Sequence, residues 1–161
     1  MLISSNNFLN KQINFMKKLF LIAIFAFTVI NFANAQEIGV RFGGTYGNAG
    51  AAIDGVFQSS LGRIHGDLGF YNGGVGIDAL LDFINKPING EEFSWYVGAG
   101  PTTYIGNDFW LGACGEIGLE YKFNTVPIVI GADWRPTFWI IKNTDFGADS
   151  FGLNVRYKFG K

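Results

Sequence analysis

From Phe109 to the C-terminus, large apolar residues alternate with small or charged residues through three successive stretches. In the first stretch the apolar set is Phe109, Leu111, Ala113, Ile117, Leu119, Tyr121 and Phe123, and the opposite set is Gly112, Cys114, Glu116, Gly118, Glu120 and Lys122. Successive side chains of a strand point to opposite faces, so each stretch has one apolar and one polar face. The pattern predicts strands of a transmembrane barrel that is apolar outside and polar inside.

Turn-forming residues divide the chain after Gln36 at similar intervals. The predicted strands span residues 37–46, 51–59, 62–71, 75–84, 92–105, 108–123, 127–141 and 150–159. Eight is the smallest number of strands that closes into a barrel, and an even number leaves both termini at one end. We therefore predict an all-β fold, an eight-stranded antiparallel transmembrane β-barrel with up-and-down meander topology and periplasmic termini.

The same alternation would suit a soluble eight-stranded barrel such as a lipocalin, with the apolar residues inside. Side-chain size favours the opposite orientation, because aromatic residues such as Phe42, Phe57, Trp95 and Phe138 would overfill a narrow lumen. Aromatic residues also gather near the strand ends, where two girdles are expected. One predicted girdle contains Tyr46, Tyr71, Trp110 and Trp139, and the other contains Trp95, Tyr121, Phe123, Tyr157 and Phe159.

The N-terminal segment has the organisation of an export signal. Two lysines follow Met16, an apolar run extends over residues 19–30, and Ala33-Asn34-Ala35 precedes Gln36. We predict a signal peptide over residues 1–35, with translation beginning at Met16, and a barrel domain over residues 36–161. The apolar run of about a dozen residues is too short for a membrane anchor, which needs roughly 20.

Charge and cysteine content exclude several classes of function. Lys11, Lys17 and Lys18 precede Gln36, whereas all thirteen Asp and Glu follow it, so the predicted barrel domain has a net charge of −4. The sequence has no basic patch that would indicate a nucleic-acid partner. The chain has one cysteine, Cys114, and one histidine, so neither a disulfide nor a zinc site of the usual nitrogen and sulfur type is expected, and no cofactor is predicted.

A set of charged residues falls on the inward-facing positions of the predicted strands. The predicted lumen network consists of Arg41, Arg63, His65, Asp67, Asp78, Glu116, Glu120, Asp133, Arg135 and Arg156, with Asp54, Asp82 and Lys122 on the same faces. An unpaired charge inside a closed barrel is costly, so the main interpretation is an ion-pair network that fills the lumen. The alternative is a narrow polar pore for small solutes or ions. Asp133 and Arg135 share one face of one strand and are the best candidates for the centre of the network.

His65 also permits a catalytic hypothesis. Outer-membrane lipid hydrolases pair a histidine with a serine, and Ser59 and Ser60 are close in sequence. Inward parity places His65 beside Arg63 and Asp67, which favours a network member over a catalytic residue. We therefore expect no catalytic residues, and an envelope lipid-modifying enzyme is the third hypothesis.

Several motifs carry a family resemblance: Trp95-Tyr96-x-Gly98-x-Gly100, residues 118–123 (GLEYKF), Pro127, residues 133–136 (DWRP) and Arg156-Tyr157-x-Phe159. Together they resemble the small outer-membrane β-barrel proteins of the Bacteroidetes, often labelled porin-family proteins. The resemblance implies an eight-stranded barrel in the cell outer membrane, with no established reaction or ligand. It also implies that Val155, Tyr157 and Phe159 form the signal recognised by the barrel-assembly machinery, followed here by Gly160 and Lys161.

The expected function is therefore a structural or interaction role in the cell envelope. The expected partners are outer-membrane lipid and the barrel-assembly machinery. The sequence leaves the ligand, the oligomeric state and the partners of the outer loops open.

Overall fold

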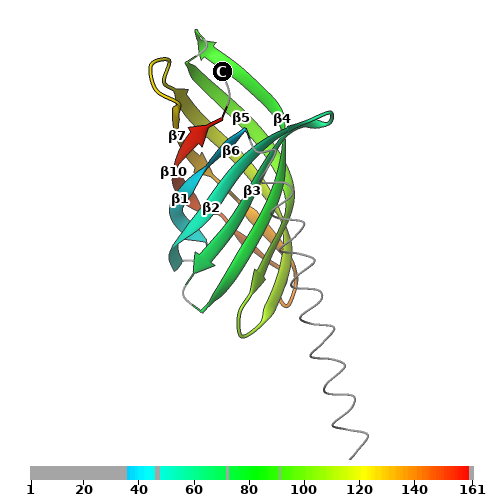
Figure 1. Cartoon of the computed structure of the whole chain (residues 1–161). Coiled ribbons are helices and arrows are strands. Elements are labelled where there is room, and N and C mark those ends of the chain that lie inside the picture. The colour runs from blue at the N-terminus through cyan, green and yellow to red at the C-terminus, as the bar shows by residue number, and fades with distance from the viewer. Residues whose placement is uncertain (1–35, 46–47, 72, 91, 160–161) are drawn as a thin grey trace, which may run out of the picture. The chain divides into compact units, whose positions relative to one another are not determined.

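The computed structural model describes residues 36–45, 48–71, 73–90 and 92–159 (Figure 1). Over these ranges the strands are β1 (Glu37–Thr45), β2 (Asn48–Ser59), β3 (Gly62–Tyr71), β4 (Gly74–Asn89), β5 (Phe93–Ile105), β6 (Phe109–Lys122), β7 (Ile128–Trp134), β8 (Thr137–Ile141), β9 (Asp145–Gly147) and β10 (Phe151–Lys158). In this described part of the chain, no helix is long and apolar enough to cross a bilayer. The predicted signal peptide over residues 1–35 lies outside the described residues.

The strands form one antiparallel meander that closes on itself. Consecutive strands pair from β1 to β6, and β1 also pairs with β10. β6 pairs with both β7 and β8, which are two halves of one strand interrupted at Arg135 and Pro136. β10 pairs with β7 and β9 pairs with β8, so β9 and β10 complete the last position. The predicted eight-stranded antiparallel barrel is confirmed.

Proline explains the interruption between β7 and β8. Pro136 has no N–H to donate, so it cannot continue a regular ladder. Its carbonyl still accepts a hydrogen bond from the Gly115 N–H at 2.9 Å, which holds the broken strand to β6. The Arg135 N–H turns the other way and donates to the Ser150 carbonyl at 2.8 Å. The break therefore fixes the position of Arg135 on the barrel wall.

The predicted end of β4 is wrong. The prediction places it at residue 84, whereas the strand continues to Asn89. Its pairing with β5 shifts between Asp82 and Ile84 and again between Pro87 and Asn89. Bulges of this kind accommodate an extra residue or a proline without ending the strand.

Both ends of the described barrel chain lie at the same end of the barrel (Figure 1). The Phe159 N–H donates to the Gln36 carbonyl at 2.7 Å, which ties the end of the last strand to the start of the first. The turns between β2 and β3 and between β6 and β7 lie at this end, which we call the termini end. Gly62 in the first of these turns has φ of +134°, a conformation that favours glycine.

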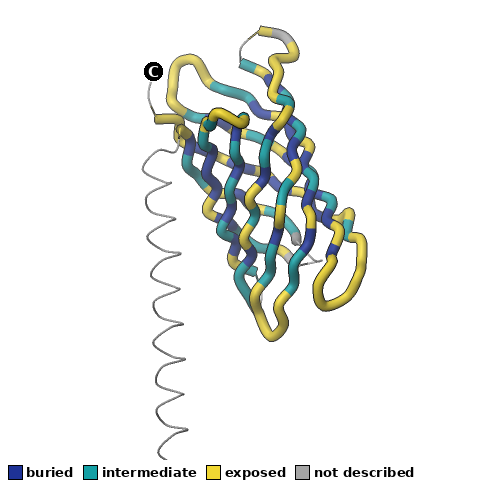
Figure 2. Tube along the Cα trace, turned by 90° about the vertical axis from the view of Figure 1, so that its right-hand side faces the viewer, coloured by how far each residue is buried: buried dark blue, intermediate teal, exposed yellow. Residues whose placement is uncertain are grey.

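Burial alternates along the strands, with apolar residues outside and charged residues inside (Figure 2). Phe83, Phe151 and Leu153 are 61%, 62% and 65% exposed. Arg135, Arg156 and Glu120 are 2%, 1% and 1% exposed. The lipocalin-like orientation, with the apolar face inside, is therefore not the one observed.

Two residues of the first predicted girdle point inward instead. Trp139 is buried and packs edge-on against Trp110, with ring centroids 6.0 Å apart. The Tyr71 ring covers glycines of three neighbouring strand positions, Gly50, Gly69 and Gly76. Both residues have the inward parity of their strands, so their position near a rim was not sufficient to place them on the outer face. Tyr46 lies outside the described residues.

Large inward side chains are accommodated by glycines on adjacent strands. The Tyr96 ring occupies the space that a Cβ at Gly118 would fill, and the Arg41 guanidinium occupies the corresponding space at Gly152. This pairing of long side chains with glycines lets a narrow lumen hold many charged groups.

Candidate functional site

Four buried arginines from different parts of the wall organise the lumen. Arg41 comes from β1, Arg63 from β3, Arg135 from the break between β7 and β8, and Arg156 from β10. Because an arginine has five N–H donors in a rigid fork, each can bind several carboxylates at once. The described acids of the lumen are arranged around these four cations.

Arg41 and Asp133 form one part of the network. The Arg41 Nε donates to both carboxylate oxygens of Asp133 at 3.0 Å, and Arg41 Nη2 donates to Oδ1 at 2.5 Å. Asn154 Nδ2 donates to the second oxygen of Asp133 at 3.1 Å. The Asp133 carboxylate therefore receives charge-assisted hydrogen bonds on both oxygens.

Glu120 is the centre of a second part, nearer the termini end. Arg63 binds it with both terminal nitrogens, at 2.8 and 2.7 Å, and Arg156 Nη2 donates to it at 2.7 Å. Arg156 also donates to Glu37 at 2.8 Å and to Asp54 at 3.2 Å. These contacts link β3, β6 and β10 through Glu120, and link β10 to β1 and β2 through Arg156.

Arg135 connects the largest number of acids. It donates to Asp67 at 2.5 Å and to Glu116 at 3.1 Å, and it lies 3.4 Å from Asp78 and 3.6 Å from Asp133. Thr102 Oγ1 donates to the other oxygen of Asp78 at 2.5 Å. Arg135, which lies at the break between β7 and β8, is thus also the central cation of the lumen.

His65 lies between two carboxylates. Its Nε2 is 2.6 Å from Asp54 Oδ1, and its Nδ1 is 3.3 Å from Glu116 Oε1. The hydroxyl of Ser59 instead donates to the carbonyl of Gly62 at 2.9 Å. The serine that suggested a catalytic pair is therefore engaged at the β2–β3 turn.

All ten residues of the predicted network lie in one connected set of ion pairs and hydrogen bonds, which we call the lumen network. The connections run from Arg41 through Asp133, Arg135, Glu116, His65, Asp54 and Arg156 to Glu120 and Arg63, with Asp67 and Asp78 on Arg135. An ion-pair set of this kind stabilises a fixed lumen geometry only if its charges are compensated.

Sequence reasoning did not single out several members. Glu37, Ser94, Tyr96 and Asn154 are buried in the same lumen. Ser94 Oγ donates to Glu120 at 3.1 Å, and the Tyr96 ring lies 5.0 Å from the Arg63 guanidinium carbon. Ser94 and Tyr96 share the parity of Gly98 and Gly100, which was the available signal.

The residues proposed as an assembly signal lie on the opposite face. Val155, Tyr157 and Phe159 are 44%, 47% and 49% exposed on the outside of the barrel. The Tyr157 and Phe159 rings meet edge to face, with centroids 5.0 Å apart. They therefore present one apolar ridge at the termini end of β10.

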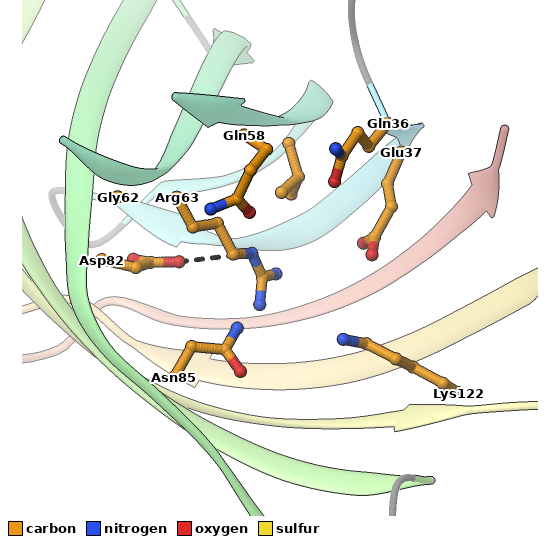
Figure 3. A pocket seen from close by; sticks show the side chains of 9 residues that line it. Gln36, Glu37, Gln58, Gly62, Arg63, Asp82, Asn85 and Lys122 are labelled. Atoms are coloured by element: carbon orange, nitrogen blue, oxygen red, sulfur yellow. Dashed lines mark ion pairs between the residues drawn. The ribbon is translucent and has the colours of Figure 1, made fainter. Parts of the chain in front are cut away.

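A polar cavity of about 400 Å³ opens at the termini end (Figure 3). It is lined by Gln36, Glu37, Val56, Gln58, Gly62, Arg63, Asp82, Asn85 and Lys122. Arg63 and Asp82 form its inner boundary with the lumen network, and their ion pair joins Nε and Oδ2 at 3.5 Å. Charged side chains occupy the lumen beyond this point, because the arginines and acids there are almost fully buried.

Comparison of the chain with protein-family models, with curated proteins and with solved structures finds no match. The interpretation of this lumen therefore rests on its own geometry.

Proposed function

We propose that this chain is an integral protein of the bacterial outer membrane, with a structural or interaction role in the cell envelope and a lumen closed by ion pairs. The observation that carries the proposal is the distribution of residues across the barrel wall, which is the reverse of that in a water-soluble protein. Large apolar side chains are exposed on the outside, whereas arginines and carboxylates are buried inside.

This distribution is favourable only if the outer face meets an apolar solvent. Exposing large apolar side chains to water costs about 25 cal/mol per Å². In lipid the cost disappears, and a closed barrel leaves no sheet edge with unpaired backbone groups in the hydrocarbon. The apolar outer face and the closed sheet therefore support a membrane environment together.

Export and assembly follow from the same proposal. Residues 1–35 would direct the chain across the inner membrane, and the ridge of Val155, Tyr157 and Phe159 would be presented to the barrel-assembly machinery. Outer-membrane lipid would then cover the apolar face. We assign no catalysis to His65, because both of its ring nitrogens face carboxylates.

The first test is gel mobility of the protein from an outer-membrane fraction, with unboiled and boiled samples compared in SDS. A closed, detergent-resistant barrel is expected to migrate faster before boiling. Equal mobilities, together with recovery of the protein in the soluble periplasm, would overturn the membrane proposal. A boiled sample refolded into detergent serves as the control, since it should regain the fast band.

The cavity at the termini end favours a second candidate function, a narrow pore. The cavity reaches as far as Arg63 and Asp82. A rearrangement of the lumen network would extend the cavity further into the barrel. Single-channel recording in a planar bilayer tests this function. Discrete openings that change in Arg135→Ala would favour the pore, and a silent, folded wild-type barrel would favour the closed lumen.

A further inference from the structure

We propose that the lumen binds one divalent transition-metal ion, with Zn²⁺ as the best fit, through His65 Nδ1 and the carboxylates of Asp82 and Glu116. The proposal adds a binding site to the closed lumen and does not depend on the membrane in which the barrel lies. It rests on ligand geometry, on orphaned polar atoms, on charge and on a route of access.

The three ligands come from neighbouring strands. Asp82 of β4 faces Gly98 of β5 in register, and Gly98 faces Glu116 of β6. His65 of β3 reaches the same place, so one ligand atom of each residue lies within 4.8 Å of the others. The Nδ1 of His65 and Oε1 of Glu116 are 3.3 Å apart. Two ligands about 2.0–2.1 Å from a tetrahedral ion would be separated by about 3.3–3.4 Å.

The same atoms lack hydrogen-bond partners. His65 Nδ1, Glu116 Oε1 and both carboxylate oxygens of Asp82 are buried and accept or donate no hydrogen bond. The three residues are 0%, 1% and 3% exposed. Buried polar atoms normally have a partner, and leaving one without a partner costs about 1–3 kcal/mol. Three residues whose atoms without hydrogen-bond partners lie close together therefore indicate a ligand.

Asp54 prepares His65 for this role. A carboxylate only accepts hydrogen bonds, so the 2.6 Å contact with Asp54 Oδ1 places the proton on His65 Nε2. When the ring is neutral with its proton on Nε2, its lone pair lies on Nδ1, on the side of Glu116 and Asp82. Carboxylate–histidine–metal arrangements use this second hydrogen bond to orient the ring.

Charge also favours a cation. Among the described residues, seven buried carboxylates face four buried arginines. The acids are Glu37, Asp54, Asp67, Asp82, Glu116, Glu120 and Asp133. Arg135 and Arg156 both lie 3.4 Å from His65 Nε2, whereas on the Nδ1 side Arg135 Nε donates to Glu116 Oε2 at 3.1 Å and Arg63 Nε lies 3.5 Å from Asp82. The described lumen therefore has more buried carboxylates than buried arginines, and a bound cation would reduce this imbalance.

The lumen provides space and access for the ion. A Cβ at Gly98 would overlap Asp82 Oδ1 and approach Glu116 Cγ at 3.2 Å, so a glycine is needed for both carboxylates to turn inward. Asp82 also lines the cavity at the termini end (Figure 3). An ion entering that cavity would meet Asp82 first and the other two ligands behind it.

His65 is the chain's only histidine, which gives a direct measurement. Barrel labelled with ¹⁵N in histidine, stripped with a chelator in detergent, would be titrated with ZnCl₂ and observed by NMR. We expect the Nδ1 resonance to shift and saturate at one Zn²⁺ per barrel, while Nε2 keeps its proton. A ring protonated on both nitrogens and unchanged by Zn²⁺ would overturn the proposal.

Variants then assign the ligands by calorimetric titration with Zn²⁺. Asp82→Asn and Glu116→Gln are expected to weaken binding at least tenfold, and Asp54→Asn about 10–100-fold through the orientation of His65. Asp67→Asn is the matched control, because it removes the same charge from the same lumen on the Nε2 side. Each variant must first show the heat-sensitive gel band of a folded barrel. Equal weakening by Asp67→Asn would mean diffuse electrostatic attraction or binding at the second group of ligands around His65, formed with Asp54 and Asp67, and would overturn the assigned site.

Discussion

The outer face and the lumen of this barrel are built from the same strands but follow opposite rules. On β6, Ile117 and Leu119 are about half exposed, whereas Glu116 and Glu120 on either side of them are buried. A water-soluble protein places these residue types the other way. The difference teaches that each face follows its own surroundings: charged side chains inside are compensated by one another, and the apolar side chains outside fit the apolar environment that we propose.

The largest expected effect comes from breaking the lumen at its centre. Arg135→Met leaves the carboxylates of Asp67, Glu116 and Asp133 without their shared cation. We expect a loss of about 3–5 kcal/mol in the free energy of unfolding, the usual cost of removing one partner of a buried ion pair. Urea unfolding in lipid vesicles, followed by tryptophan fluorescence, measures it. A loss below about 1 kcal/mol would contradict a central role for Arg135.

The next effect tests the outer face. Ile117 lies near the middle of β6, between Val97 and Trp134 in register. In vesicles, Ile117→Arg is expected to lower the free energy of unfolding by about 2–4 kcal/mol, since a charge would enter the hydrocarbon. Leu61→Arg is the control, because Leu61 is 79% exposed in the β2–β3 turn. Similar stability of the two variants would mean that the outer face does not contact lipid.

A smaller effect tests how the lumen accommodates large side chains. Gly118→Ala brings a Cβ into the Tyr96 ring, so we expect a loss of about 1–3 kcal/mol from overpacking. Gly115→Ala on the same strand meets no atom closer than 3.8 Å and should leave the stability unchanged or slightly higher. The same urea titration compares the two. Tyr96→Leu combined with Gly118→Ala should recover much of the loss, and no recovery would place the strain elsewhere.

The smallest effect is expected for an ion pair outside the lumen. Lys142 pairs with Asp108 beyond the strand ends, and both side chains are partly exposed. Lys142→Met should change the free energy of unfolding by less than about 1 kcal/mol, and high salt should reduce the difference further. A change as large as that of Arg135→Met would show that burial does not distinguish the two pairs.

Much of the fold could be predicted because a strand has a side-chain period of two. The alternation from Phe109 onward fixes which residues share a face, and the turns fix the number of strands. The same parity placed Arg41, Glu120 and Arg156 together on the lumen side. Position near a rim was less informative than parity, because Tyr71 and Trp139 lie near a rim but point into the lumen, as their parity indicates.

The sequence by itself determined the two faces of the wall, because alternation is a local property of each strand. The tertiary structure decided the partners, because closure and register bring together residues far apart in the chain. Arg41 meets Asp133 across 92 positions, and the bulge after Asp82 sets how β4 continues along β5. His65 was recognisable as an inward residue, but only the closed barrel places its Nδ1 beside Asp82 and Glu116.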